Sequence, residues 1–468
     1  MMSHTALHAT ACIGCRRRGR KCDRTLPSCL SCENRGVACE GYVTKWPGVA
    51  ARGKLAGKSI PVFDSSATLT KIRSTSKRAR QKQIKQDVSA QDDSDGQNSS
   101  RNRCSSIADD EVDEFVQHYI ADLSSIFFLG NGPSENPMFH YVLPLVNTVP
   151  PIRFTLAGSA SCHIAARNSD EALERKSLRL RVHATHLLRG MLQNPTTATD
   201  QVILASILML AQLDMCSGDC TEFQTHLKAA ATVIRNEGYD GAANRYYFEQ
   251  RLAWLDVMSS TTSTQQPNLT LEEAKTIIWR FPVNGKRQWS YDVFPCPIDL
   301  FEIIIDITFL FKSQQGRPSP HTLQPEVSHL RDRLCAWKCP FMLGSRKHMV
   351  ETWRLGIMAY VQRLFPHTGS EVEAKHLSSQ VLDLAEQIPP ASSWSYALLW
   401  PIFQAAVTLD DDAVDEKETI RKRLRIALEA IGCRHHSNAL EVLEVVWGRS
   451  EKYDPFTISI PGRTIMLV

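Results

Sequence analysis

Long apolar runs are absent from this sequence of 468 residues. The longest strictly apolar stretch, ILMLA beside Ser206, is far shorter than the roughly 20 residues that cross a bilayer. The first ten residues, MMSHTALHAT, lack the apolar core of a secretory signal. We therefore expect no membrane segment and no secretion. In a reducing compartment, clustered cysteines are metal ligands more often than disulfides.

Sequence motifs of enzyme chemistry are also missing. We find no nucleophile elbow, no phosphate-binding glycine loop and no His-Glu metalloprotease motif. Runs of period two that are rich in β-branched residues are scarce, which disfavours a sheet. The hydrophobic content of 43% is ordinary for a globular protein, and the length suits two or three folding units. These absences favour an all-α protein and leave an enzyme hypothesis without support.

The charge is divided unevenly along the chain. Residues 1–103 carry 20 Lys/Arg against 8 Asp/Glu, whereas the remaining residues carry 34 against 42. The head is therefore basic and the body acidic, although the net charge is only +4. This asymmetry predicts a polyanionic partner for the head alone.

Cysteines are crowded into one basic stretch, CIGCRRRGRKCDRTLPSCLSCENRGVAC. It contains two copies of the spacing C-x2-C-x6-C, with cysteines at Cys12, Cys15, Cys22, Cys29, Cys32 and Cys39. A structural zinc ion takes four ligands, so six thiolates saturate two zinc ions only if two of them bridge both metals. The alternative, free or redox cysteines in an unfolded tail, does not explain the repeat. Because the stretch has no apolar core, we expect metal binding to supply most of its folding free energy.

This spacing resembles the DNA-binding module of the fungal binuclear zinc cluster transcription factors. The resemblance implies two structural zinc ions, with Cys12 and Cys29 as bridging ligands and the other four cysteines as terminal ligands. Because the six thiolates fill both metal shells, no position is left for a catalytic water.

The residues between Cys15 and Cys22 are nearly all cationic, unlike their counterparts in the second copy. A solvated charge run is one interpretation, but adjacent cations repel each other unless phosphates neutralise them. In the family this segment is a short helix that reads a CGG triplet in the major groove. The resemblance and the bidentate pairing of arginine with guanine make Arg18 the candidate base reader. The expected phosphate contacts are Arg16, Arg17, Arg20, Lys21 and Arg24. Gly19 departs from the family, which usually has lysine there.

The composition divides the chain into four parts. We predict a disordered tail at 1–10, a zinc cluster DNA-binding domain at 11–42, a flexible basic linker at 43–106 and an all-α regulatory domain at 107–468. The basic stretch at 71–86 suits a nuclear localisation signal, a second phosphate contact or a solubilising run. An apolar heptad begins at Leu69 and Ile72 but is broken at Ser76 and Gln83. The linker thus holds no clear coiled coil, and a homodimer through other surfaces stays open.

Helical periodicity dominates the sequence beyond residue 107. Apolar stripes of period 3.6 occur at 377–388 and 420–431, and 197–214 is apolar nearly all round, as in a central helix. Gly238 is expected to end the helix before it. Segments 115–128, 136–146, 225–238 and 432–447 resemble the regulatory domain of many fungal transcription factors. That resemblance implies regulation with sensing of a ligand or partner, and it names no ligand.

Other candidate sites have ordinary explanations that we prefer. Unliganded buried cysteines account for the C-x3-C pairs Cys216/Cys220 and Cys335/Cys339, and a helix-end histidine pair accounts for His435 and His436 beside Cys433. An acidic activating surface at 409–418 competes with a solvated loop between helices, which we favour.

The function predicted from these features is that of a nuclear, sequence-specific transcription regulator. We expect it to bind double-stranded DNA and co-regulators or the transcription machinery, and to activate RNA polymerase II genes of one pathway or biosynthetic cluster. Two alternatives stay open. One is an interaction protein with weakened DNA reading, which Gly19 would suit. The other is a zinc or thiol enzyme with a basic tail.

Overall fold

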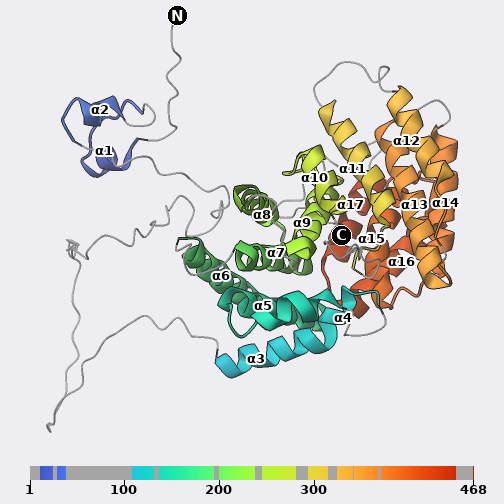
Figure 1. Ribbon diagram of the computed structural model, residues 1–468, viewed down its shortest axis with the longest axis horizontal. Coiled ribbons are helices and arrows are strands. Elements are labelled where there is room, and N and C mark those ends of the chain that lie inside the picture. Colours follow the sequence, from blue (N-terminus) through green and yellow to red (C-terminus); the bar gives the residue numbers. More distant parts are fainter. Residues whose placement is uncertain are drawn as a thin grey trace, which may run out of the picture. The chain divides into compact units, whose positions relative to one another are not determined.

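The computed structural model describes residues 11–24, 29–37, 39, 108–130, 136–193, 200–237, 245–280, 293–314, 324–340, 342–366, 370–448 and 467. It forms two compact units, one within residues 1–99 and one within residues 100–468. All regular elements in these described ranges are helices, which confirms the mainly α fold (Figure 1). None of those helices is long and apolar enough to span a membrane. The predicted linker, with its basic stretch and broken heptad, and Gly238 lie outside the described residues.

The N-terminal unit repeats in structure as it does in sequence. Helix α1 (Ile13–Arg17) follows Cys12, and helix α2 (Leu30–Glu33) follows Cys29. Each helix ends in a turn through a left-handed glycine, Gly19 with φ 62° and Gly36 with φ 63°. The same backbone hydrogen bonds close both turns, with lengths of 3.2 and 2.9 Å after α1 and 2.9 and 3.2 Å after α2.

The second unit is a helical domain with one extended apolar core. Its elements in chain order are α3 (Asp109–His118), the π-helix η1 (Tyr119–Leu123), α4 (Ser124–Ile126), the π-helix η3 (Met138–Val142), the 3-10 helix η4 (Leu143–Leu145), α5 (Pro150–Asn168), α6 (Glu171–Gln193), α7 (Asp200–Ser217), α8 (Phe223–Glu237), α9 (Arg245–Ser260), α10 (Leu271–Trp279), α11 (Ile298–Ser313), α12 (Gln324–Ala336), α13 (Ser345–Leu364), α14 (Ser370–Glu386), the 3-10 helix η7 (Ser393–Leu398), α15 (Leu399–Ala406), α16 (Val414–Ile431) and α17 (His435–Trp447).

Helix α7 lies at the centre of the first half of this domain, as its all-round apolar sequence predicts. It packs against α5, α6, α8 and α9, and every residue from 203 to 216 is buried. Helix α5 begins with Pro150 and Pro151, where a missing N–H costs nothing. It ends at Ser169, which takes a left-handed conformation with φ 54°. Figure 1 shows α5 and α6 on the opposite side of the domain from α12–α14.

Aromatic side chains fill the second half of the core. The rings of Trp353 on α13 and Trp400 on α15 stack with centroids 5.2 Å apart and planes 8° apart. The two helices approach closely because Gly356 has no side chain, and a Cβ there would lie 2.5 Å from the Cβ of Pro401. The predicted apolar stripes face this packing. Residues 377 and 381 of α14 and residues 420, 424, 427 and 431 of α16 are buried, as is 388 just after α14, and 384 and 428 are half-buried.

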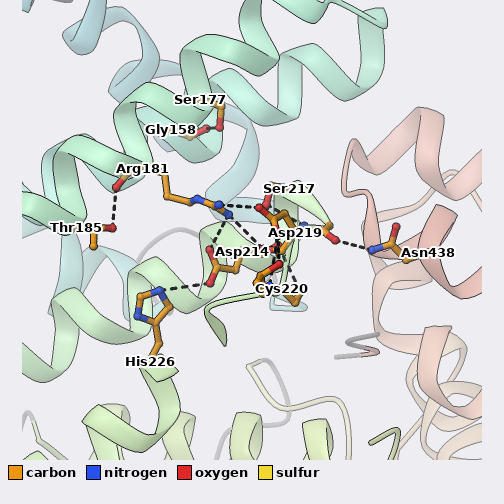
Figure 2. Close-up of polar contacts among 12 residues, drawn as sticks. Gly158, Ser177, Arg181, Thr185, Asp214, Ser217, Asp219, Cys220, His226 and Asn438 are labelled. Carbon is orange, nitrogen blue, oxygen red and sulfur yellow. Dashed lines mark hydrogen bonds and ion pairs between the residues drawn. The ribbon is translucent and has the colours of Figure 1, made fainter. Parts of the chain in front are cut away.

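A polar network ties α6, α7, α8 and α17 together (Figure 2). Arg181 on α6 lies 3.2 Å from Asp214 Oδ1 and 2.7 Å from Asp219 Oδ2. The second oxygen of Asp214 lies 3.4 Å from His226 Nε2 on α8. Asn438 on α17 donates a 2.8 Å hydrogen bond to the carbonyl of Gly218 in the loop after α7. Burial raises the pKa of Asp214 to about 8 although Arg181 lies beside it, and the hydrogen bonds from Arg181 to Asp214 and Asp219 link α6 to the end of α7.

Candidate zinc centre and nucleic-acid interface

Four thiols of the N-terminal unit converge on one point. The Sγ atom of Cys12 lies 3.6 Å from that of Cys29 and 3.8 Å from that of Cys32. The Sγ atom of Cys15 lies 3.8 and 3.7 Å from the same two sulfurs. All four side chains are buried, although the unit has no other apolar core among its described residues.

These sulfur–sulfur distances match those expected around a zinc ion with four thiolate ligands. With a Zn–S bond of about 2.3 Å, the edge of a regular tetrahedron of sulfurs is about 3.8 Å. Sulfurs that are 3.6–3.8 Å apart can therefore surround one zinc ion without moving far. The cysteines are arranged for metal binding.

The third cysteine of each copy lies beside the first cysteine of that copy. The backbone N–H of Cys12 donates to Cys22 Sγ at 3.4 Å, and that of Cys29 donates to Cys39 Sγ at 3.4 Å. A second group of potential ligands joins Cys22 with Asp23 and Cys29. Cys29 thus belongs to both groups of potential ligands.

The surroundings of three of the thiols disfavour the negatively charged thiolate form when no cation is bound. Burial raises the pKa of Cys12 to about 12 and also raises the pKa values of Cys15 and Cys29. Burial acts on Cys22 in the same direction, but hydrogen bonds from the backbone of Cys12 and Arg24 and from neighbouring thiols outweigh it and lower its pKa to about 7. A divalent cation would stabilise all of these groups as thiolates.

Asp23 is a structural residue of the unit that the sequence analysis missed. Its Oδ2 accepts from the backbone N–H of Leu30 at 3.0 Å, and its Oδ1 accepts from that of Ser31 at 2.6 Å. The carboxylate therefore caps the start of α2 and joins the two copies. The available signal was an isolated acid directly after a cysteine, inside a run of cations.

The cations expected to contact DNA lie at the end of α1 and in the turn that follows it. Arg16 and Arg17 form the last turn of α1, and Arg18 is its C-cap. In the second copy the corresponding positions are Glu33, Asn34 and Arg35. One lobe of the unit is therefore cationic and the other is not. The predicted DNA-contacting residues are all exposed, namely Arg16, Arg17, Arg18, Arg20, Lys21 and Arg24.

Comparison with protein families agrees with this geometry. The family model described as "Fungal specific transcription factor domain" matches residues 114–457, and that described as "Fungal Zn(2)-Cys(6) binuclear cluster domain" matches residues 10–46. The chain belongs to the fungal-specific transcription factors. Both resemblances found in the sequence are thereby confirmed. No curated protein and no solved structure gave a significant match.

Membership of the fungal-specific transcription factors establishes the general function of the chain. It is a DNA-binding transcription regulator whose zinc cluster domain binds two zinc ions. The family description names a regulator rather than an enzyme.

The other predicted candidates do not assemble into a metal site. Among the residues with described side chains, convergent groups of three or more potential ligands occur only in the N-terminal unit. Cys433 Sγ lies 3.9 Å from Cys216 Sγ, and both cysteines are buried. The predicted carbonyl-capping role of the histidine pair is wrong, because His435 and His436 begin α17, where the free backbone groups are N–H donors. His436 Nδ1 lies 3.2 Å from the carbonyl oxygen of Cys433, and both ring nitrogens of His435 lack a hydrogen-bond partner. The acidic stretch is an exposed turn at 410–412 followed by the start of α16.

Proposed function

We propose that the chain activates RNA polymerase II genes of one metabolic pathway or biosynthetic gene cluster by binding CGG-like sites in double-stranded DNA. The observation that carries the DNA-binding part is the exposed row of cations attached to a cluster of four converging sulfurs. Such a scaffold holds like charges together, and phosphates then neutralise them. Activation of a single pathway is what the resemblance of both domains implies.

The six cysteines divide into bridging and terminal ligands in this proposal. Cys29 belongs to both groups of potential ligands, and Cys22 hydrogen-bonds the side chains of Cys29 and Cys12. These contacts support Cys12 and Cys29 as the bridging ligands. The terminal ligands are then Cys15, Cys22, Cys32 and Cys39. The zinc ions are structural, because six thiolates leave no open position for water.

Arg18 is the residue that we assign to base reading. It caps the C-terminal end of α1, the end that in the family enters the major groove. Its planar guanidinium can donate two parallel hydrogen bonds to O6 and N7 of guanine. The remaining cations, Arg16, Arg17, Arg20, Lys21 and Arg24, contact phosphates and set the orientation of the module.

The backbone conformation at position 19 explains why glycine stands there in place of the usual lysine. Gly19 has φ 62°, and its counterpart Gly36 in the second copy, which has no cationic run, has φ 63°. Glycine therefore serves the same left-handed turn in both copies. This favours a DNA-reading module over an interaction protein that has lost its contacts to DNA.

Selection of sites from random DNA by the full-length protein tests this proposal. We expect enriched CGG triplets and, in the same preparation, two zinc ions per chain. The spacing and orientation of enriched half-sites would show whether a homodimer binds, and nuclear localisation can be followed with a fluorescent fusion. A protein that holds two zinc ions but enriches no sequence would contradict the proposal and favour the interaction-protein alternative.

A further inference from the structure

Helix α6 presents an outer face that the rest of the domain does not cover. The helix packs mainly against α5 and α7, and it buries a stripe of small or apolar side chains on that side. Figure 1 shows α6 at the edge of the domain, next to α5. The opposite stripe of the helix, which we call the α6 face, is exposed and consists of Arg175, Leu178, Arg179, Val182, His186 and Arg189.

The α6 face is cationic, although the helical domain as a whole carries more acids than bases. From residue 175 to residue 193 the helix contains five Lys/Arg and two His, and it contains no Asp or Glu. The two cations outside the face are used within the domain. Lys176 pairs with Glu111, and Arg181 pairs with Asp214 and Asp219 (Figure 2). No ion pair joins the three arginines of the face to an acid in the described part of the chain.

The acids at the start of α6 do not neutralise the face. Glu174 is engaged by both terminal nitrogens of Arg434, at 2.7 and 2.9 Å. Arg175 donates to the carbonyl of Glu171 at 3.2 Å, which is a hydrogen bond within its own helix. Arg175 and Arg179 are four residues apart, and like charges at this spacing destabilise a helix. An external acid would therefore stabilise α6 as well as bind to it.

Two aliphatic side chains lie among these cations. Leu178 is 51% exposed and Val182, one helical turn further on, is 61% exposed. DNA phosphates are recognised through charge and hydrogen bonds, so a duplex would leave both side chains in water. Helix α3 of a second copy is acidic, but its apolar side chains Val112, Phe115 and Val116 are buried in its own domain. The complement of the α6 face thus carries both acids and exposed apolar groups.

We propose that the α6 face is a docking site for an acidic amphipathic helix of a partner protein. The apolar stripe of that helix contacts Leu178 and Val182, and its carboxylates pair with Arg175, Arg179 and Arg189. Charge complementarity brings the partner to this face and selects against basic helices, and the apolar contact excludes water around the ion pairs. The face belongs to the helical domain, so this interaction goes beyond the DNA reading assigned to the N-terminal unit.

The probe for this site is a synthetic helical peptide of about 20 residues, with leucines along one face and glutamates on the others. Its affinity for the full-length protein is measured by fluorescence anisotropy. We expect Arg179→Glu to weaken binding at least about tenfold, because attraction is replaced by repulsion, and Val182→Ser to weaken it several-fold. The N-terminal cations also attract an acidic peptide, so the readout is the difference between each variant and the wild type.

The matched control changes the same kinds of residue on α14, which lies on the opposite side of the domain (Figure 1). Val372 is 78% exposed and the side chain of Lys375 is 60% exposed. They are three residues apart, as are Arg179 and Val182. Val372→Ser and Lys375→Glu should leave the affinity for the peptide unchanged. Added salt should weaken binding by the wild type and reduce the effect of Arg179→Glu.

Three outcomes would overturn the proposal. The first is equal affinity of the wild type and Arg179→Glu for the peptide. The second is a general polyanion site, shown by equal binding of a peptide with alanine in place of leucine, or by an affinity for random duplex DNA that falls as the peptide affinity does in Arg179→Glu. The third is self-association of the wild type, seen by analytical ultracentrifugation and abolished by Arg179→Glu. Selection of DNA sites by Arg179→Glu should match the wild type, so this proposal and the proposed function can fail separately.

Discussion

The two units of this chain are stabilised by different means. In the N-terminal unit the buried side chains are thiols, and its two helices are only five and four residues long. The helical domain instead buries a continuous core of aliphatic and aromatic side chains contributed by α3 through α17. A short segment cannot bury enough apolar surface to offset its conformational entropy, so it depends on metal ligation. The domain needs no such help.

The difference extends to charge. The N-terminal unit exposes its cations together on one lobe, whereas outside the α6 face the helical domain distributes its arginines among ion pairs such as Arg235–Glu273 and Arg421–Glu444. A concentrated exposed patch of one charge sign attracts an external polyanion, and ion pairs spread over a domain do not. The comparison predicts that each unit can be disabled with little effect on the stability of the other.

Removal of zinc should have the largest effect and should be confined to the N-terminal unit. A strong chelator should abolish DNA binding, measured by fluorescence anisotropy, because the thiols lose the cations that hold them together. The thermal midpoint of the helical domain, measured by calorimetry, should not move. Cys29→Ser should reproduce the loss of DNA binding, and Cys335→Ser, at an exposed cysteine, is the control. Sequence-specific binding that survives complete loss of zinc would refute this division.

Truncation of a side chain in the apolar core should have the converse effect, which is to destabilise the helical domain and leave zinc binding unchanged. Leu210→Ala removes a fully buried side chain at the centre of α7 and should cost about 2–5 kcal/mol of unfolding free energy. Leu178→Ala, at a leucine that is 51% exposed, should change it by less than about 0.5 kcal/mol. Chemical denaturation measures both, and the zinc content of both variants should equal that of the wild type. Similar losses from the two substitutions would mean that α7 is not central to the core.

The asymmetry between the two zinc lobes can be tested with one pair of arginines. Arg18 and Arg35 occupy corresponding positions in the two copies and are both exposed. Arg18→Ala should weaken binding to the selected DNA site by about 1–3 kcal/mol and relax its base preference. Arg35→Ala should have little effect on either property. If the two substitutions weaken binding equally, the first lobe does not read the bases.

The smallest expected effect on stability concerns a helix cap in the helical domain. Thr270 and Glu273 form a capping box at the start of α10, and Arg235 donates to both oxygens of Glu273. The hydrogen bonds from Arg235 lower the pKa of Glu273 to about 2. Its folded-state pKa lies below the unfolded value, so the stabilisation is present above about pH 4.5 and is lost as the pH falls towards 2.

Glu273→Gln should therefore reduce the unfolding free energy near neutral pH and converge with the wild type in acid. Thr270→Ala should cost about 1 kcal/mol at neutral pH. Denaturation curves at several pH values measure both effects. An unfolding free energy of Glu273→Gln that stays below that of the wild type by the same amount at every pH would show that the ionised carboxylate does not contribute.

Much of the molecule could be predicted from patterns among residues that are close together in the sequence. The repeated cysteine spacing identified the zinc module, because ligands of one metal must lie close together in a short chain. The apolar length of 197–214 identified the central helix, since a helix without a polar face must be buried on all sides. The position of Asp23 in a run of cations was a signal of a special role, but the role itself depends on the backbone of α2 in the other copy.

Three properties follow from the order of the residues alone: the zinc-binding spacing, the cationic loop and the helical character of the long C-terminal region. These properties depend on residues that are neighbours along the chain or one helical turn apart. It took the folded domain to bring Arg251, Tyr396 and Leu467 together around one small cavity. The lining of a cavity depends on which side chains from distant parts of the sequence meet there, and no local pattern records that.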